Sequence, residues 1–117
     1  MSESRLVKLI QTFFSKVGGR LFRNNTGAFR DKRGNYVKFG LVNGGSDLIG
    51  FFPLTVTRSM VGRKFAIFVA CEVKSRKGKP TTAQLRFIDM VKQNGGGADV
   101  VRSLHDAAKI LHGLYLG

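Results

Sequence analysis

The sequence is short of cysteine, of acidic residues and of long apolar runs. Its 117 residues include one Cys, two Pro, no Trp and seven Asp or Glu. A single Cys excludes an internal disulfide, and no Cys and His cluster has the spacing of a zinc site. The longest apolar run, Phe65–Cys71, is far shorter than the ~20 residues of a membrane-spanning helix. With no signal peptide evident, these features favour a protein of a reducing, cytoplasmic compartment that is neither secreted nor inserted in a membrane.

Basic and aromatic residues are plentiful instead. Twenty Lys and Arg against seven acids give a formal net charge of +13, and 43% of the residues are hydrophobic, including ten Phe. This chain is too apolar for a disordered polycation and long enough to form one domain over 1–117. The excess of positive charge indicates a polyanionic partner.

The pattern of apolar and turn-forming residues predicts an α/β protein. We expect helices over 4–17, from Thr81 to about 94, and after Ser103, with strands at 20–23, 48–52, 64–74 and 98–102. Residues 24–40 are a basic loop or hairpin, and 59–64 read as a hairpin connection. The order α-β-β-β-α-β-α predicts a mixed β-sheet flanked by helices, in which the two strands of the βαβ segment 65–102 run parallel.

The segment 64–74 is the strongest strand. Its nearly continuous apolar run predicts a central strand covered on both faces, in which Cys71 packs as a small apolar side chain. Glu72 and Lys74 follow this run two residues apart and so share one face, with Val73 on the other.

Two of the scarce acids can form a metal site. Asp47 stands where a glycine-rich turn meets a strand, and Glu72 stands near the end of the next strand, so their carboxylates converge if the two strands pair. Carboxylates and a backbone carbonyl suit Mg²⁺ or Mn²⁺. Lys74 can orient or deprotonate an attacking water, and Gln84 can hydrogen-bond a phosphate or a metal-bound water. The alternative is a plain Glu72–Lys74 salt bridge, which would leave an acid without function in a strand that is otherwise apolar.

A train of short motifs carries a family resemblance. Gly45-Ser46-Asp47 followed by Glu72-Val73-Lys74 resembles the PD-(D/E)XK nuclease signature, with Ser46 where a proline often stands. With Glu3 before this pair and Gln84 and Asp99-Val100-Val101-Arg102 after it, the order is similar to the VRR-NUC family in its short stand-alone, virus-type form. The Val-Arg-Arg stretch that names the family is Val101-Arg102-Ser103 here.

The resemblance implies a restriction-endonuclease-like core and a set of site residues. Asp47 and Glu72 would be metal ligands together with the Val73 carbonyl, Lys74 would be the catalytic lysine, and Gln84 would help to build the site. Glu3 would complete the metal site, although its place in the first helical turn equally suits the helix dipole. The resemblance also implies a homodimeric, Mg²⁺- or Mn²⁺-dependent endonuclease that cuts branched DNA such as four-way junctions or flaps.

Two groups of basic residues adjoin these motifs. We expect them to flank the mouth of the site and to hold DNA phosphates: Arg30, Lys32, Arg33 and Lys38 before Asp47, and Arg76, Lys77 and Lys79 after Lys74. No base-reading motif is present, which favours recognition of DNA shape and backbone. Arg102 either supports DNA or packs structurally, and the sequence leaves both open.

Two other functions remain open. A non-catalytic nucleic-acid-binding module would explain the charge equally well, but it gains nothing from carboxylates that face phosphates. A restriction-type enzyme that reads a base sequence is disfavoured because the chain has little room for a recognition element.

Overall fold

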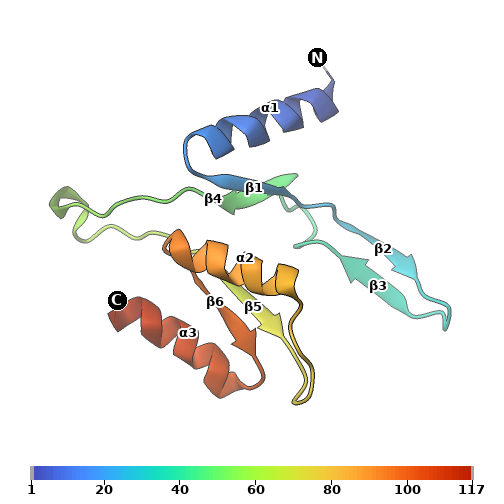
Figure 1. The fold of residues 1–117 in the computed structure, drawn as a ribbon. Helices are drawn as coiled ribbons and strands as arrows, with labels where there is room; N and C mark the ends of the chain where they lie inside the picture. The colour runs from blue at the N-terminus through green and yellow to red at the C-terminus, as the bar shows by residue number, and fades with distance from the viewer. Residues whose placement is uncertain (1, 117) are drawn as a thin grey trace. The chain divides into compact units, whose positions relative to one another are not determined.

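The computed structural model describes residues 2–116, which divide into two compact units, one reaching Leu54 and the other starting at Thr55. The first unit contains α1 (Glu3–Lys16), β1 (Arg20–Arg23), β2 (Gly27–Arg30), β3 (Tyr36–Phe39) and β4 (Leu48–Phe51) (Figure 1). The second contains the short 3-10 helix η1 (Arg58–Met60), β5 (Val69–Val73), α2 (Thr82–Gln93), β6 (Gly97–Val101) and α3 (Leu104–Leu116). Whether the chain functions as a single domain stays a prediction.

Helix α1 begins and ends within one residue of the predicted bounds, 4–17. The Ser2 hydroxyl accepts a hydrogen bond from the Arg5 N–H at 3.2 Å, which caps the helix, and Glu3 lies in the first turn. The helix stops at two glycines: Gly18 adopts a positive φ of 93°, and the Gly19 N–H donates to the Phe14 carbonyl at 2.8 Å. This sharp stop turns the chain directly into β1.

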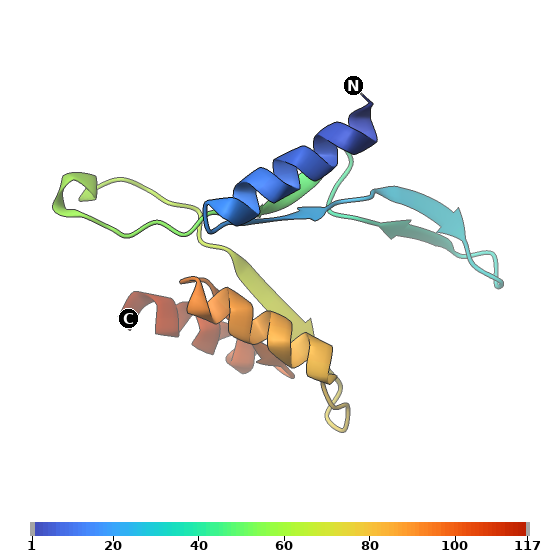
Figure 2. The same ribbon diagram turned by 45° about the horizontal axis from the view of Figure 1, so that its top comes forward.

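The four strands of the first unit form two antiparallel pairs. β1 pairs with β4, and Leu21 faces Gly50 at the centre of that pair. β2 pairs with β3, so the hairpin interpretation of residues 24–40 is confirmed. In Figures 1 and 2 this hairpin extends as a two-stranded ribbon from the end of β1.

The second unit is a βαβ segment with helices on both faces. β5 and β6 are parallel, as predicted. Ala98 packs with Ile88 and Val91 of α2, whereas a Cβ on the preceding residue, Gly97, would meet Ile110 of α3 at 2.7 Å. Because successive strand residues face opposite sides, α2 and α3 cover opposite faces of the two strands (Figure 2).

The predicted capping residues of the second unit are confirmed. Thr81 and Gln84 form a capping box at the start of α2. The Ser103 hydroxyl accepts a hydrogen bond from the Asp106 N–H at 3.1 Å at the start of α3. None of the helices within residues 2–116 is long and apolar enough to cross a membrane.

The architecture is mixed α/β, but its strands do not form the one mixed sheet that the sequence led us to expect. Over residues 2–116 they form three two-stranded sheets, β1–β4, β2–β3 and β5–β6. The pairing of the strand after Asp47 with the strand that carries Glu72 is not among them. Strands of four or five residues carry little local information about their partners, so the sequence pattern could not select the pairing.

The prediction of a long, covered strand over 64–74 is wrong. β5 begins only at Val69, and Val69 and Val73 are 42% and 73% exposed. Cys71 is exposed as well, which corrects its expected place in the core. The physical reason is that, among the strands of residues 2–116, β5 pairs only with β6, a strand of five residues. The connection expected at 59–64 contains the 3-10 helix η1 instead of a hairpin turn.

Candidate functional site

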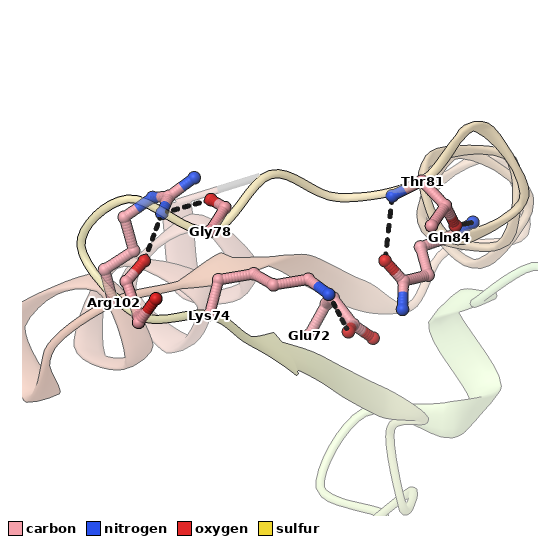
Figure 3. A network of polar contacts seen from close by, with 7 residues as sticks. Glu72, Lys74, Gly78, Thr81, Gln84 and Arg102 are labelled. Atoms are coloured by element: carbon pink, nitrogen blue, oxygen red, sulfur yellow. Dashed lines mark hydrogen bonds and ion pairs between the residues drawn. The ribbon is translucent and has the colours of Figure 1, made fainter.

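Glu72 and Lys74 lie together at the end of β5. Their side chains share one face of the strand, as the sequence predicts, and the Lys74 Nζ is 3.4 Å from the Glu72 Oε1 (Figure 3). The two side chains are 31% and 21% exposed, so each head group is partly withdrawn from water yet still reachable. The Lys74 N–H donates to the Val101 carbonyl at 3.1 Å, which ties the end of β5 to β6.

The carbonyl of Val73 is free of the β5–β6 ladder. Phe68 and Lys74 bond to β6 through their backbone, since Gly97 donates to the Phe68 carbonyl and Lys74 donates to Val101. In a parallel ladder every second residue faces the partner strand, so Val73 turns its backbone polar groups away from β6. This carbonyl therefore suits the role of a metal ligand next to the Glu72 carboxylate.

Gln84 is fixed at the first turn of α2 by its own capping box. The Gln84 side-chain Oε1 accepts the backbone N–H of Thr81 at 2.9 Å, and the backbone N–H of Gln84 donates to the Thr81 hydroxyl at 3.1 Å. Figure 3 shows the side-chain amide directed to the side of β5 that carries Glu72 and Lys74. The oxygen is thus occupied, and the amide nitrogen is the group that Gln84 can offer to a phosphate.

Arg102 organises the basic loop between β5 and α2. Its Nη1 donates to the Gly78 carbonyl at 2.7 Å (Figure 3) and to the Ser75 carbonyl at 2.6 Å. The Arg76 carbonyl lies at 3.4 Å from the same nitrogen. These bonds turn the loop carbonyls inward. The side chains of Arg76, Lys77 and Lys79, which the sequence predicts to bind phosphate, are exposed. Of the two roles left open for Arg102, the structure shows the structural one.

Replacing Arg102 by alanine is expected to loosen this loop. Trypsin cleavage after Arg76 and Lys77 should become at least about fivefold faster, because hydrogen bonds from a charged group typically contribute about 1.5–3 kcal/mol. Cleavage at Lys32 and Arg33 in the first unit is the internal reference. Arg86→Ala removes the same charge from α2 and should leave the loop rate unchanged. Equal rates of loop cleavage in Arg102→Ala, Arg86→Ala and the native chain would contradict the role of Arg102 in holding the loop.

Asp47 lies in the first unit, in the turn before β4. A tight turn precedes it, in which Gly44 has a φ of +84° and the Gly45 N–H donates to the Val42 carbonyl at 2.9 Å. The Asp47 backbone carbonyl accepts the Asn24 N–H at 2.8 Å, which fixes its main chain. Its side chain is exposed, and its carboxylate has no hydrogen bond or ion pair within residues 2–54, so it is free to bind a ligand.

Asn24 is a positioning residue that the sequence did not reveal. Its Oδ1 accepts the Leu41 N–H at 2.9 Å, and its Nδ2 donates to the Ser46 carbonyl at 3.0 Å. Together with its main-chain bond to Asp47, these contacts tie both ends of the 41–47 turn to the end of β1. No local signal marks this role, because the bonded groups lie 17 and 22 residues away along the chain.

Glu3 is also in the first unit and is exposed in the first turn of α1. This position confirms the placement expected for a helix-dipole role, and its metal role stays a prediction. No group of three or more His, Cys, Asp and Glu side chains lies together as metal ligands in the part of the chain from 2 to 116. The structure thus brings Glu72 and Lys74 together in the second unit, which also contains Gln84, and places Asp47 and Glu3 in the first.

The remaining basic residues predicted to bind DNA belong to the β2–β3 hairpin. Arg30 and Lys38 lie on its strands, and Lys32 and Arg33 lie at its tip. Asp31 is a turn residue, as predicted. Its carboxylate accepts the Asn35 N–H at 2.8 Å and the Arg33 N–H at 2.9 Å, and these bonds, the one from Asn35 first, lower its pKa. Because the folded pKa is depressed, this contribution to hairpin stability is present at neutral pH and is lost as the pH falls through that pKa.

Comparison with protein-family models, with curated proteins and with solved structures gives no match to this chain. The similarity to VRR-NUC nucleases therefore rests on the motifs alone and stays a prediction.

Proposed function

We propose that this protein is a Mg²⁺- or Mn²⁺-dependent endonuclease that hydrolyses phosphodiester bonds in branched DNA. One observation supports this most: the Lys74 Nζ lies 3.4 Å from the Glu72 Oε1 at the end of β5, with Gln84 at the start of the next helix. A chain with seven acids against twenty basic residues places a partly exposed carboxylate beside a lysine and next to a basic loop. That combination suits an enzyme acting on a polyanion better than it suits a plain surface ion pair.

The donor set of the proposed site fits a hard divalent cation. Asp47, Glu72 and the Val73 carbonyl would supply the oxygen ligands that Mg²⁺ and Mn²⁺ prefer, and Glu3 is a further candidate. When bound, the metal would supply Lewis-acid polarisation of the scissile phosphate. The proposal also requires a restriction-endonuclease-like core, which is a more specific architecture than the mixed α/β fold described above.

The chain's own residues then carry the remaining steps. The Lys74 ammonium lies beside the Glu72 carboxylate, where it can orient an attacking water and stabilise negative charge on the phosphoryl oxygens of the transition state. Gln84 donates from its amide nitrogen to a phosphate oxygen. The basic loop that Arg102 holds in place binds flanking phosphates, and so does the β2–β3 hairpin. These contacts position the DNA backbone without reading its bases. A homodimer with two such sites would cut two strands of a junction in a cytoplasmic setting.

A cleavage panel tests this proposal. Four-way junction, flap and linear duplex DNA are incubated with the protein in Mg²⁺, in Mn²⁺ and in EDTA. We expect cutting of the branched DNAs in either metal, at least about tenfold faster than cutting of the duplex, and none in EDTA. Binding without cleavage in all three buffers would overturn the proposal and favour the non-catalytic binding module. Cutting of linear duplex at one defined site would indicate a restriction-type enzyme.

A further inference from the structure

The β2–β3 hairpin has two unlike faces. The register pairs Ala28 with Lys38 and Arg30 with Tyr36, and because paired residues share a face, these four side chains form one surface, the Tyr36 face. Phe29 and Phe39 lie on the other face with their ring centroids 6.3 Å apart. The apolar packing of the hairpin is thus confined to one side, and the Tyr36 face combines an aromatic ring with two cations.

Arg30 is held in place beside the tyrosine. Its Nη1 donates to the Gly34 carbonyl at 3.0 Å, and its guanidinium carbon lies 5.8 Å from the centroid of the Tyr36 ring. The Tyr36 side chain is nevertheless 62% exposed. The guanidinium lies over the ring, so a planar group has access to the part of the Tyr36 ring that Arg30 leaves uncovered, next to a cation that is already positioned.

The one acid of the hairpin does not compete for these cations. The Asp31 carboxylate accepts hydrogen bonds from the backbone N–H of Arg33 and from the backbone and side-chain N–H groups of Asn35. Four basic side chains remain on the ribbon for an external anion: Arg30, Lys32, Arg33 and Lys38.

We propose that the Tyr36 face binds an unpaired nucleotide of DNA, with its base stacked on Tyr36 and its flanking phosphates contacted by Arg30 and Lys38. An exposed aromatic ring that shares one face with two cations provides the two features that single-stranded nucleic acid recognises, a stacking surface and phosphate-binding charges. In a duplex the faces of the bases are covered by their neighbours, whereas branch points and single strands expose them. The ligand class rests on the proposed function, and the new element is Tyr36 as the residue that selects unpaired bases.

Tyrosine fluorescence reports this contact directly. The chain has no Trp and two Tyr, so in a Tyr115→Phe variant Tyr36 is the sole strong intrinsic fluorophore. The variant is titrated in EDTA with a short oligothymidine, and separately with an abasic strand of the same length and charge. We expect the oligothymidine to quench the Tyr36 emission and the abasic strand to bind with little quenching. Equal quenching by both strands would overturn stacking.

Two matched substitutions complete the test. Tyr36→Phe keeps a ring and should retain affinity for oligothymidine within about twofold, as measured by anisotropy of a labelled strand. Tyr36→Leu should weaken it by between about fivefold and about 100-fold, in line with the contribution of one stacked base. Phe13→Leu, which changes an aromatic residue 61% exposed on α1, is the control and should bind as the native chain does. Equal affinity of Tyr36→Leu and the native chain would overturn the proposal.

These measurements contain no metal and no cleavage, so they separate this inference from the nuclease. If the protein fails to cut DNA, but oligothymidine quenches Tyr36 and Tyr36→Leu loses affinity for it, the nucleotide-binding face stands and the nuclease proposal fails. A chain that cuts branched DNA normally with Tyr36→Leu, and binds single strands equally well, retains the nuclease and loses the Tyr36 proposal.

Discussion

Replacing Glu72 by glutamine is expected to lower the rate of metal-dependent cleavage by at least about 10²- to 10³-fold, similar to the effect of deleting one electrostatic stabiliser in other enzymes. The substitution keeps the shape of the side chain and removes the charge that would bind the metal. The fold should tolerate it, because the ion pair with Lys74 is partly exposed and such pairs contribute about 0–1 kcal/mol. Single-turnover cleavage of a junction in Mn²⁺ measures the rate, and circular dichroism checks the fold.

The neighbouring strand offers a matched control. Asp99 lies on β6 opposite Cys71, so its side chain is on the other face of the strands from Glu72. Asp99→Asn removes one exposed carboxylate from the same small sheet and should leave cleavage within about twofold of the native rate. Lys74→Ala should match Glu72→Gln in its loss. Native cleavage by Glu72→Gln would refute the assignment of this site.

Replacing Gly50 by alanine is expected to disrupt the pairing of β1 with β4. A Cβ at Gly50 would overlap the Arg20 carbonyl oxygen and would come within 2.9 Å of the Leu21 Cα, and neither backbone atom can rotate away. We expect a loss of at least about 2 kcal/mol in the free energy of unfolding, at the level of severe overpacking. The substitution should also displace Asp47, because the Asp47 carbonyl accepts a hydrogen bond from the Asn24 N–H at the end of β1.

Thermal unfolding followed by circular dichroism measures this effect. The control is Gly113→Ala in α3, where an added Cβ meets nothing within 4 Å. Alanine is a better helix former than glycine by up to about 1 kcal/mol, so this variant should be as stable as the native chain or more so. If the two alanine variants melt at the same temperature, the close approach of β1 and β4 at Gly50 is not what stabilises the first unit.

Local features of this protein followed from local sequence. Ser2, Thr81 and Ser103 mark the starts of the three α-helices found within residues 2–116 because each capping hydroxyl bonds to an N–H three residues away. The shared face of Glu72 and Lys74 followed from the two-residue period of a strand. The hairpin at 24–40 followed from its turn residues, of which Asp31 makes the bonds expected of it.

Partners that are distant in the chain did not follow from the sequence. Which strand pairs with β4 or with β5, and therefore how exposed Cys71 is, depends on contacts that no local pattern specifies. The roles of Arg102 and Asn24 were hidden for the same reason, since each bonds to backbone groups 17 to 27 residues away. A long polar side chain can reach many carbonyls, and only the packed backbone decides which of them lie within 3 Å.

The structure shows where two of the few acidic residues lie and what they contact. The sequence by itself determined that few carboxylates stand among many cations, and that Glu72 and Lys74 share a strand face, because both facts depend only on composition and on strand periodicity. The tertiary structure decided that Arg102 holds the loop beside them, that the Asp31 carboxylate is hydrogen-bonded within its own turn, and that Tyr36 is exposed with Arg30 over its ring. It decided these because hydrogen bonds and exposure are set by which segments meet in space.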